Sequence, residues 1–161
     1  MKKVYVFLAE GFEEMEAVTP VDLLRRVNPE AVEVKLVSVT GDKAVTGAHG
    51  ITYQADLLFE EMEDDADMLV LPGGMPGTTN LMAHEGLAEL LVKHYEARKW
   101  VAAICAAPMV LGALGIVMGR WATIYPVWKN IWLAQISPKK KYVSAVTLSH
   151  LKPPAQQFLS L

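Results

Sequence analysis

Short apolar runs that alternate with helical patterns constrain the fold of this chain more than any other sequence feature. Residues 4–8, 67–71 and 100–104 are largely apolar stretches of strand length, each followed by a loop rich in small residues. Residues 13–26 and 81–98 repeat apolar side chains at helical spacing. Continuous apolar strands separated by helices predict an α/β domain, with a parallel sheet covered by helices on both faces.

Composition and charge further limit the kind of protein that this sequence can encode. The chain has 161 residues, which favours one domain with a sizeable core, and its net charge of −3 gives no indication of a nucleic-acid partner. Residues 101–118 are apolar, but Pro108 and glycines interrupt them, so they are interpreted as strand and helix and not as a membrane span. No signal peptide is visible, and the single cysteine fits a reducing compartment, so a cytoplasmic protein is expected.

The only cysteine, Cys105, stands between the apolar strand 100–104 and a helix expected over residues 106–115. Backbone N–H groups and the dipole at a helix start favour a thiolate, so this position suits a reactive thiol. A buried structural cysteine fits the same local sequence, because free cysteine is among the most buried residue types. The local context alone leaves both interpretations open.

Three loops are expected to meet at one edge of the sheet, because parallel α/β sheets bind ligands at the carboxyl ends of their strands. They are residues 9–16, 72–77 and 105–108. The second loop contains Gly73-Gly74, which either makes a tight turn or lets backbone N–H groups approach an oxyanion together with the N–H of Ala106. It lacks the spacing of a phosphate-binding loop.

The first loop carries three acids at a helix start. Glu13 and Glu14 are explained by the helix dipole, which favours carboxylates in the first turn. Glu16 lies on another face and can point toward the strand ends. There its pKa would be raised, and a protonated carboxyl could donate to a thiolate or act as a general acid and base.

The remaining candidate ligands are sparse. His49 lies in a hairpin expected over residues 44–53, where it either lines the pocket or faces solvent, and His84 and His94 are expected on the solvent side of a helix. No spacing typical of metal ligands is present, so neither a metal site nor a cysteine–histidine dyad is predicted. The methionines and Trp100 are expected in the core.

Taken together, the three loops resemble a known family. Val-Phe-Leu-Ala-Glu-Gly-Phe-Glu-Glu-Met-Glu-Ala, Leu-Pro-Gly-Gly-Met-Pro-Gly and Ala-Ala-Ile-Cys-Ala-Ala-Pro are similar to the motifs of the ThiJ/PfpI superfamily, in the branch of the Parkinsonism-associated protein DJ-one. The resemblance runs from residue 1 to about residue 126. It implies a flavodoxin-like, doubly wound parallel sheet between helices, and a homodimer.

The resemblance also implies roles for particular residues. Cys105 corresponds to the reactive thiol and Glu16 to its protonated partner, while Gly73, Gly74 and Ala106 match positions whose backbone lines an anion pocket. No cofactor is implied.

Two positions refine this assignment. The protease-like branch has histidine directly after the cysteine, so Ala106 argues against that branch. Tyr125 replaces a histidine of some members, so a third polar partner at the pocket is left open.

After residue 126 the resemblance stops, and residues 97–161 contain no aspartate or glutamate. A shifted reading of degenerate codons lets residues 145–157 encode Gly-Asn-x-Ile-Thr-Ser-Lys-Ala-Pro-Gly-Thr-Ala, which is the ending of the family. We therefore treat 1–126 as the α/β domain and hypothesise that 127–161 is a frameshifted tail. The family's last strand and helix would then be missing or aberrant. The alternative is a divergent natural tail.

The expected function follows mainly from the resemblance. It implies a cofactor-independent glyoxalase or deglycase that acts on α-oxoaldehydes such as methylglyoxal, or on their early adducts, through the Cys105 thiolate. The alternative is a redox-responsive stress protein or chaperone with Cys105 as the oxidised residue. The expected partners are a small reactive aldehyde or glycated adduct and a second copy of the chain, with no nucleic acid and no membrane.

Overall fold

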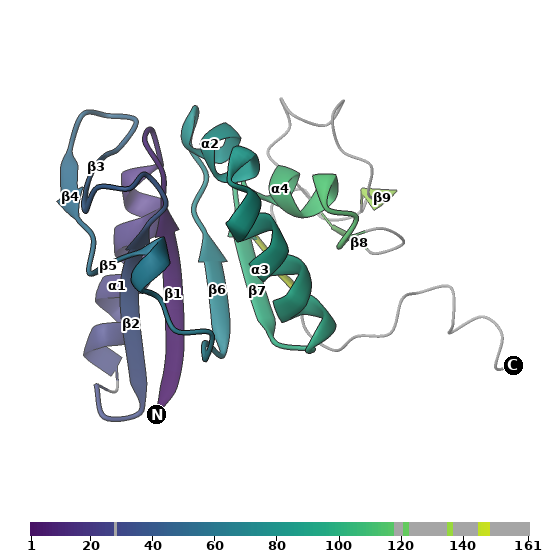
Figure 1. Cartoon of the computed structure of the whole chain (residues 1–161), viewed down its shortest axis with the longest axis horizontal. Coiled ribbons are helices and arrows are strands. Elements are labelled where there is room, and N and C mark those ends of the chain that lie inside the picture. The colour runs from purple at the N-terminus through teal and green to yellow at the C-terminus, as the bar shows by residue number, and fades with distance from the viewer. Residues whose placement is uncertain (28, 118–120, 123–134, 137–144, 149–161) are drawn as a thin grey trace, which may run out of the picture.

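A computed structural model of the chain describes residues 1–27, 29–117, 121–122, 135–136 and 145–148 (Figure 1). The helices and strands, in chain order, are β1 (Lys2–Leu8), α1 (Glu14–Val27), β2 (Val32–Ser38), β3 (Ala44–Thr46), β4 (Thr52–Gln54), β5 (Leu57–Leu58), the 3-10 helix η1 (Phe59–Glu61), β6 (Met68–Leu71), α2 (Gly77–Ala83), α3 (Glu85–Glu96), β7 (Trp100–Ile104), α4 (Pro108–Ala113), β8 (Trp121–Ala122), β9 (Gln135–Ile136) and β10 (Ala145–Leu148).

The central sheet has the order β10-β7-β6-β1-β2-β5. All its pairs are parallel except β10 with β7, which is antiparallel. Because β2 and β6 lie on opposite sides of β1, the strand order reverses at the carboxyl ends of β1 and β6. This reversal is the usual ligand position in open α/β sheets. The predicted α/β class and doubly wound parallel sheet are confirmed.

Helices cover both faces of this sheet because β1 is apolar on both sides. Tyr5 and Phe7 belong to one buried cluster, which includes Leu81, Leu91 and Leu111 of α2, α3 and α4. The alternate side chains of β1 (Val4, Val6 and Leu8) pack in a second cluster with Ala17 and Val21 of α1. Strand alternation thus sends successive side chains into two cores, as expected for a sheet between two helical layers.

The helix predicted over residues 81–98 is in fact two helices, α2 and α3, which meet at His84. The His84 backbone is extended, with φ −85° and ψ 102°, and its side chain accepts a hydrogen bond from the Leu87 N–H. This bond caps the start of α3, because a first-turn N–H has no partner within its own helix. His84, which was expected on the solvent side of a single helix, therefore separates two helices.

Some predictions of burial were wrong. Met15 and Trp100 were expected in the core, but they are 68% and 46% exposed, and Met75 and Met82 are also exposed. These exposed side chains lie on the outside of the fold, which apolar character alone does not reveal.

The helix expected over residues 106–115 is shorter than predicted and spans Pro108–Ala113.

His94 was expected to face solvent and is instead 3% exposed. It lies on α3 at the same face as the buried Leu87 and Leu91, spaced by a helical repeat. Its Nε2 atom has no hydrogen-bond partner, and burial, followed by the charge of Lys99, lowers the pKa of His94.

A pH dependence of stability follows from this buried imidazole. The pKa of His94 is lower folded than unfolded, so the folded state binds fewer protons. Stability should therefore fall as the pH drops below about 6.5, the unfolded value, and level off once the folded state is also protonated. Urea midpoints at about pH 7.5 and about pH 5.5 should differ more in the unmodified chain than in His94→Leu. Equal losses in the two proteins would contradict this.

Between residues 127 and 161 the structure describes only β9 and β10. β10 lies at the sheet edge and pairs with β7 from Ala145 opposite Ile104 to Leu148 opposite Val101. The proposed boundary between residues 126 and 127 and most of the hypothetical frameshifted tail fall outside the described residues, so both stay predictions. Within the described residues, no helix combines the length and apolar composition needed to cross a membrane.

Candidate active site

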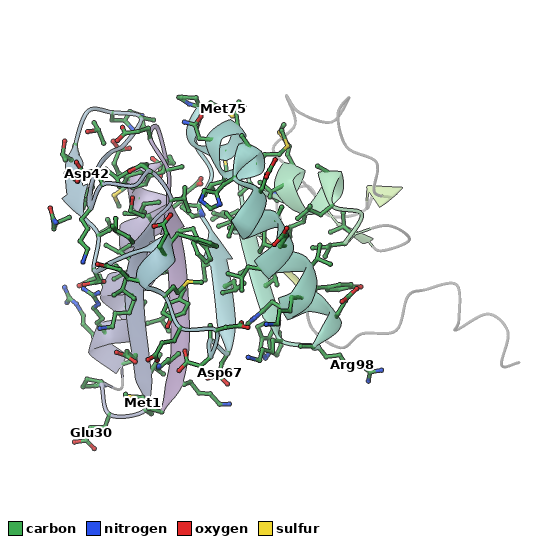
Figure 2. All side chains as sticks on the ribbon, viewed as in Figure 1. Met1, Glu30, Asp42, Asp67, Met75 and Arg98 are labelled. Atoms are coloured by element: carbon green, nitrogen blue, oxygen red, sulfur yellow. The ribbon has the colours of Figure 1, made fainter. Side chains whose placement is uncertain are left out.

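The three loops predicted to converge do so at the carboxyl end of the sheet. Figure 2 marks this end by Met75, which follows β6, and the opposite end by Asp67, which precedes it. Backbone hydrogen bonds link the first two loops, since the Glu13 N–H donates to Gly73 O at 2.9 Å and the Gly77 N–H to Gly11 O at 3.1 Å. The site therefore rests on backbone contacts between loops that are far apart in sequence.

Cys105 occupies the sharp turn between β7 and α4. Its φ of 59° lies in the left-handed region, which side chains other than glycine rarely adopt. The turn closes through the Ala107 N–H, which donates to Ile104 O at 2.9 Å. Such a conformation costs about 1–3 kcal/mol and tends to occur at functional sites, so it favours the reactive interpretation of this half-buried thiol.

Glu16 reaches the same place from the first turn of α1. Its Oε2 accepts the Gly73 N–H at 2.8 Å, and the interaction of its carboxyl group with the thiol raises the pKa of Cys105. Its own N–H donates to Glu13 Oε2 at 2.8 Å, an N-terminal cap that fixes the first turn of α1. The acid and the thiol predicted from the sequence thus lie side by side, on either side of Gly73.

Gly73 makes this arrangement sterically possible. A Cβ atom there would lie 2.7 Å from Glu16 Oε2, 2.8 Å from Cys105 Cβ and 3.0 Å from Ala106 N. Real Cβ atoms essentially never approach closer than 3.0 Å, so any other side chain would displace the acid or the thiol. The absence of a side chain at Gly73 is therefore a requirement of the site as well as of the turn.

The electrostatics of Cys105 and Glu16 are coupled. Burial raises the pKa of the Cys105 thiol and the Glu16 carboxyl raises it further, while the N–H groups of Ala106 and Gly74 lower it. Burial likewise raises the pKa of Glu16, against hydrogen bonds from Gly73 and Cys105. The Glu16 carboxyl therefore hinders ionisation of the thiol, whereas the thiol favours ionisation of Glu16, so the two groups titrate together.

The prediction that the helix start alone favours a thiolate is therefore incomplete. α4 has six residues, and both burial and the Glu16 carboxylate oppose ionisation of the sulfur. A thiolate at Cys105 is favoured when Glu16 carries the proton, because the carboxyl then donates to the sulfur and the charge repulsion disappears.

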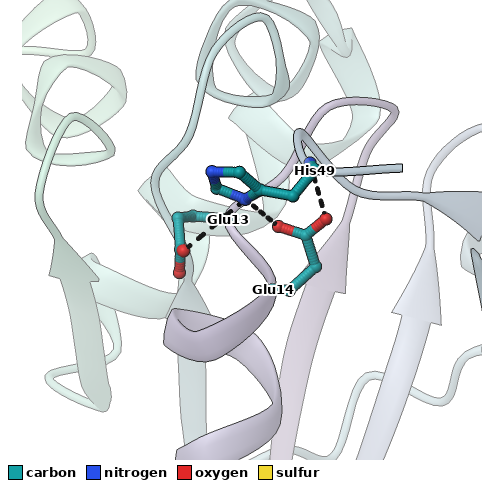
Figure 3. A group of neighbouring side chains, drawn as sticks. All are labelled: Glu13, Glu14 and His49. Carbon is teal, nitrogen blue, oxygen red and sulfur yellow. Dashed lines mark hydrogen bonds and ion pairs between the residues drawn. The ribbon is translucent and has the colours of Figure 1, made fainter. Parts of the chain in front are cut away.

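His49 lies in the turn between β3 and β4 and is anchored to Glu14 (Figure 3). Its backbone N–H donates to Glu14 Oε1 at 2.7 Å, and its Nδ1 lies 2.7 Å from Oε2. The Glu14 side chain is only 5% exposed and the His49 side chain is 67% exposed. Burial raises the pKa of Glu14, but the hydrogen bonds from His49 outweigh it and lower that pKa, while Glu14 raises the pKa of His49.

Glu14 has a structural role beside the site that the sequence interpretation missed. Both acids at this helix start were assigned to the dipole, yet Glu14 is buried against the hairpin and holds it in place. A Cβ atom at Gly47 would strike the Glu14 carboxyl, so the hairpin backbone packs directly on it. No local signal marks this contact, because Gly47 and His49 are more than thirty residues away in sequence.

Among the described residues, Glu13, Glu14 and His49 form the group whose donor atoms could hold a metal ion, all within 4.8 Å of one another. Their arrangement is accounted for by the Glu14–His49 pair and by the helix cap that Glu13 provides. Tyr125, named from the resemblance, lies outside the described residues.

With this geometry established, comparison with known proteins identifies the family. A family model described as the DJ-1/PfpI family matches residues 2–147. The chain belongs to the DJ-1/PfpI family. The family resemblance predicted from the three loops is confirmed.

Several DJ-1/PfpI relatives share more than a third of their aligned residues with this chain. A deglycase of Thermococcus kodakarensis is 39% identical over 123 residues, which cover 75% of this chain and 70% of that protein. The Parkinson disease protein 7 homolog of Danio rerio is 36% identical over 136 residues, covering 83% and 70%. Protein DJ-1 homologs B and A of Arabidopsis thaliana are both 37% identical, but this chain spans only 29% and 32% of their lengths.

Solved structures of the DJ-1/PfpI family share the same fold. Oxidized Toxoplasma gondii DJ-1 has a TM-score of 0.77 at 35% identity and covers 82% of this chain and 71% of that one. Drosophila melanogaster DJ-1beta has a TM-score of 0.79 at 29% identity and covers 92% and 81%. These neighbours support the flavodoxin-like arrangement expected from the sequence.

Proposed function

We propose that this DJ-1/PfpI protein is a cofactor-independent enzyme of the glyoxalase or deglycase type, acting on α-oxoaldehydes or their early adducts through Cys105. The observation that supports it most is the placement of Cys105 and Glu16 on either side of Gly73, beside the Gly74 and Ala106 N–H groups that lower the pKa of the thiol. Three relatives named deglycases, at 39%, 37% and 34% identity, support the reaction class.

The first step is addition of the thiolate to the aldehyde carbon. The carbon–sulfur bond forms as the carbonyl electron pair moves to oxygen, which takes up a proton to give a hemithioacetal. The Gly74 and Ala106 N–H groups lower the pKa of the thiol, and in this proposal they also stabilise negative charge on the neighbouring oxygen. A half-buried site excludes much of the competing water, which strengthens these interactions.

The second step moves a proton between the two substrate carbons. Glu16, as a carboxylate after the first step, removes the proton from the hemithioacetal carbon and returns it to the former ketone carbon, while the hemithioacetal hydroxyl proton passes to the former ketone oxygen. The product is a thioester of a hydroxy acid on Cys105. Water then cleaves the carbon–sulfur bond, which releases the hydroxy acid and restores the thiol, so one water is consumed for each aldehyde.

The proposal is tested by incubating the protein with methylglyoxal and following lactate by proton NMR. Lactate should form without added thiol or metal and should persist with a chelator present, because every reacting group belongs to the chain. Turnover that requires an added metal would contradict the mechanism. No lactate, together with oxidation of Cys105 by peroxide to a species with two added oxygens, would favour the second candidate.

That second candidate is a redox-responsive protein in which Cys105 is the sensor. It is favoured by the solved relative named as oxidized Toxoplasma gondii DJ-1 and by the same donors around the sulfur. A sulfinate at Cys105 could accept hydrogen bonds from Gly74, Ala106 and protonated Glu16. Both candidate functions depend on the Cys105 thiol. They are compatible in one protein, except that oxidation of Cys105 would stop turnover.

We extend the proposal to a homodimer, as the family resemblance implies. Met15 supports it, since this methionine is 68% exposed on α1 next to the candidate site, and exposed apolar side chains of this size are common in interfaces.

A further inference from the structure

Glu13, Glu16 and Gly73 are joined in a closed ring of hydrogen bonds. The Glu13 N–H donates to Gly73 O at 2.9 Å, and the Gly73 N–H donates to Glu16 Oε2 at 2.8 Å. The ring closes where the Glu16 N–H donates to Glu13 Oε2 at 2.8 Å. The place of the Glu16 carboxyl beside Cys105 therefore depends on both the backbone and the side chain of Glu13.

Glu13 also places a negative charge near Glu16, the acid of the Cys105–Glu16 pair. Its carboxylate adds to the effect of burial and raises the pKa of Glu16. In the described part of the chain, the basic group within 4.0 Å of it is His49, whose pKa Glu14 and Glu13 raise; its Nδ1 lies 3.9 Å from Glu13 Oε1 and is bound more closely by Glu14 (Figure 3). The negative charge of Glu13 is thus only partly offset.

A proton shared by Cys105 and Glu16 has two positions. It can sit on sulfur beside a Glu16 carboxylate, or on Glu16 beside a thiolate. The Glu13 carboxylate, which is bonded to the Glu16 N–H, disfavours the first arrangement, because that arrangement places two carboxylates together. The groups that face Glu16 are Cys105 from the β7–α4 turn and Glu13 from its own helix start, and His49 reaches Glu13 from the hairpin.

We propose that Glu13 is a positioning residue that holds Glu16 against Cys105 and biases their shared proton toward Glu16, leaving the sulfur as the thiolate. This rests on the proposed function in one respect, namely that the thiolate is the reacting form. Glu13 touches neither the sulfur nor the substrate carbon in this scheme and acts only through Glu16.

The rate of Cys105 alkylation by iodoacetamide, measured across pH, tests this without any substrate turnover. Glu13→Gln keeps an oxygen that can accept the Glu16 N–H but loses the charge. Its rate near neutral pH should fall about 3–10-fold, since a tenfold change corresponds to one pKa unit. Glu13→Asp keeps the charge and a good capping group, so it should react close to the unmodified rate. Asp22→Asn, an exposed α1 residue paired with Arg26, is the matched control.

A second variant tests the charge by another route. His49→Gln can still donate to Glu14 but removes the imidazole whose protonated form offsets the charge of Glu13, so alkylation should become faster at pH values where His49 is protonated. Equal rates for Glu13→Gln and the unmodified chain, equal slowing in Glu13→Gln and Glu13→Asp, or slower alkylation in His49→Gln would each overturn the proposal. Absence of methylglyoxal turnover in the unmodified protein would refute the proposed function and leave this test unaffected.

Discussion

Replacing Cys105 with serine is expected to lower lactate formation from methylglyoxal by about a thousandfold or more, because a serine hydroxyl does not ionise under conditions in which a thiolate forms. Serine is nearly isosteric with cysteine and can occupy the same turn, so the thermal unfolding temperature should change little. Glu16→Gln should lower turnover by about a hundredfold or more, since an amide cannot accept and return a proton.

These two variants have a matched reference in Asp22→Asn, which removes an α1 carboxylate that pairs with Arg26 and lies outside the site. Its turnover should equal that of the unmodified chain. Turnover that survives in Cys105→Ser would remove the thiol from the mechanism. Turnover that survives in Glu16→Gln would mean that another group moves the proton.

Gly74→Ala is expected to produce the largest loss of stability, about 3–5 kcal/mol. The φ of Gly74 is +88°, which alanine adopts only with strain, and a Cβ atom would lie 2.7 Å from the carbonyl carbon of Phe12 and 2.8 Å from Gly11 O. It would also strike the Glu13 nitrogen. Because all these atoms are backbone, no side chain can rotate to relieve the contact.

Gly41→Ala separates strain from crowding. Gly41 has a φ of +84°, but a Cβ atom there would meet nothing within 4 Å. It should cost only about 1–2 kcal/mol, the penalty of the left-handed backbone alone. Urea unfolding of both variants measures the difference. If Gly74→Ala is no less stable than Gly41→Ala, the close approach of the first two loops is not what holds the site together.

The elements that could be predicted from the sequence are those set by local pattern. β1, β6 and β7 are continuous apolar runs, and the rule that ligands bind at the carboxyl ends of parallel strands was enough to bring Cys105, Glu16 and Gly73 together. The combination of the three loop motifs in one sequence, more than any single motif, indicated the DJ-1/PfpI family.

The features that could not be predicted depend on which face of an element the fold covers. His94 shares a buried face with Leu87 and Leu91, whereas Met15 and Trp100 lie on outer faces. The burial of Glu14 depends on a hairpin more than thirty residues away. Helical spacing shows which residues share a face but not which face meets the sheet.

The chemistry of the thiol likewise needed the tertiary structure. The helix start predicted an easily ionised Cys105, but burial and Glu16 raise its pKa. In the proposed mechanism the thiolate forms when the neighbouring acid takes the proton, and the pKa of that acid is raised by burial and by Glu13. We therefore propose that the reactive unit is the pair together with its hydrogen-bond ring.

The most direct test of that account is the rate at which iodoacetamide alkylates Cys105 as the methylglyoxal concentration is raised during turnover. If the thiolate forms the bond to the substrate, alkylation should slow and saturate, with half of the effect at the concentration that gives half-maximal lactate production. An alkylation rate unchanged by saturating methylglyoxal, while lactate continues to form, would contradict the assignment of Cys105 as the nucleophile.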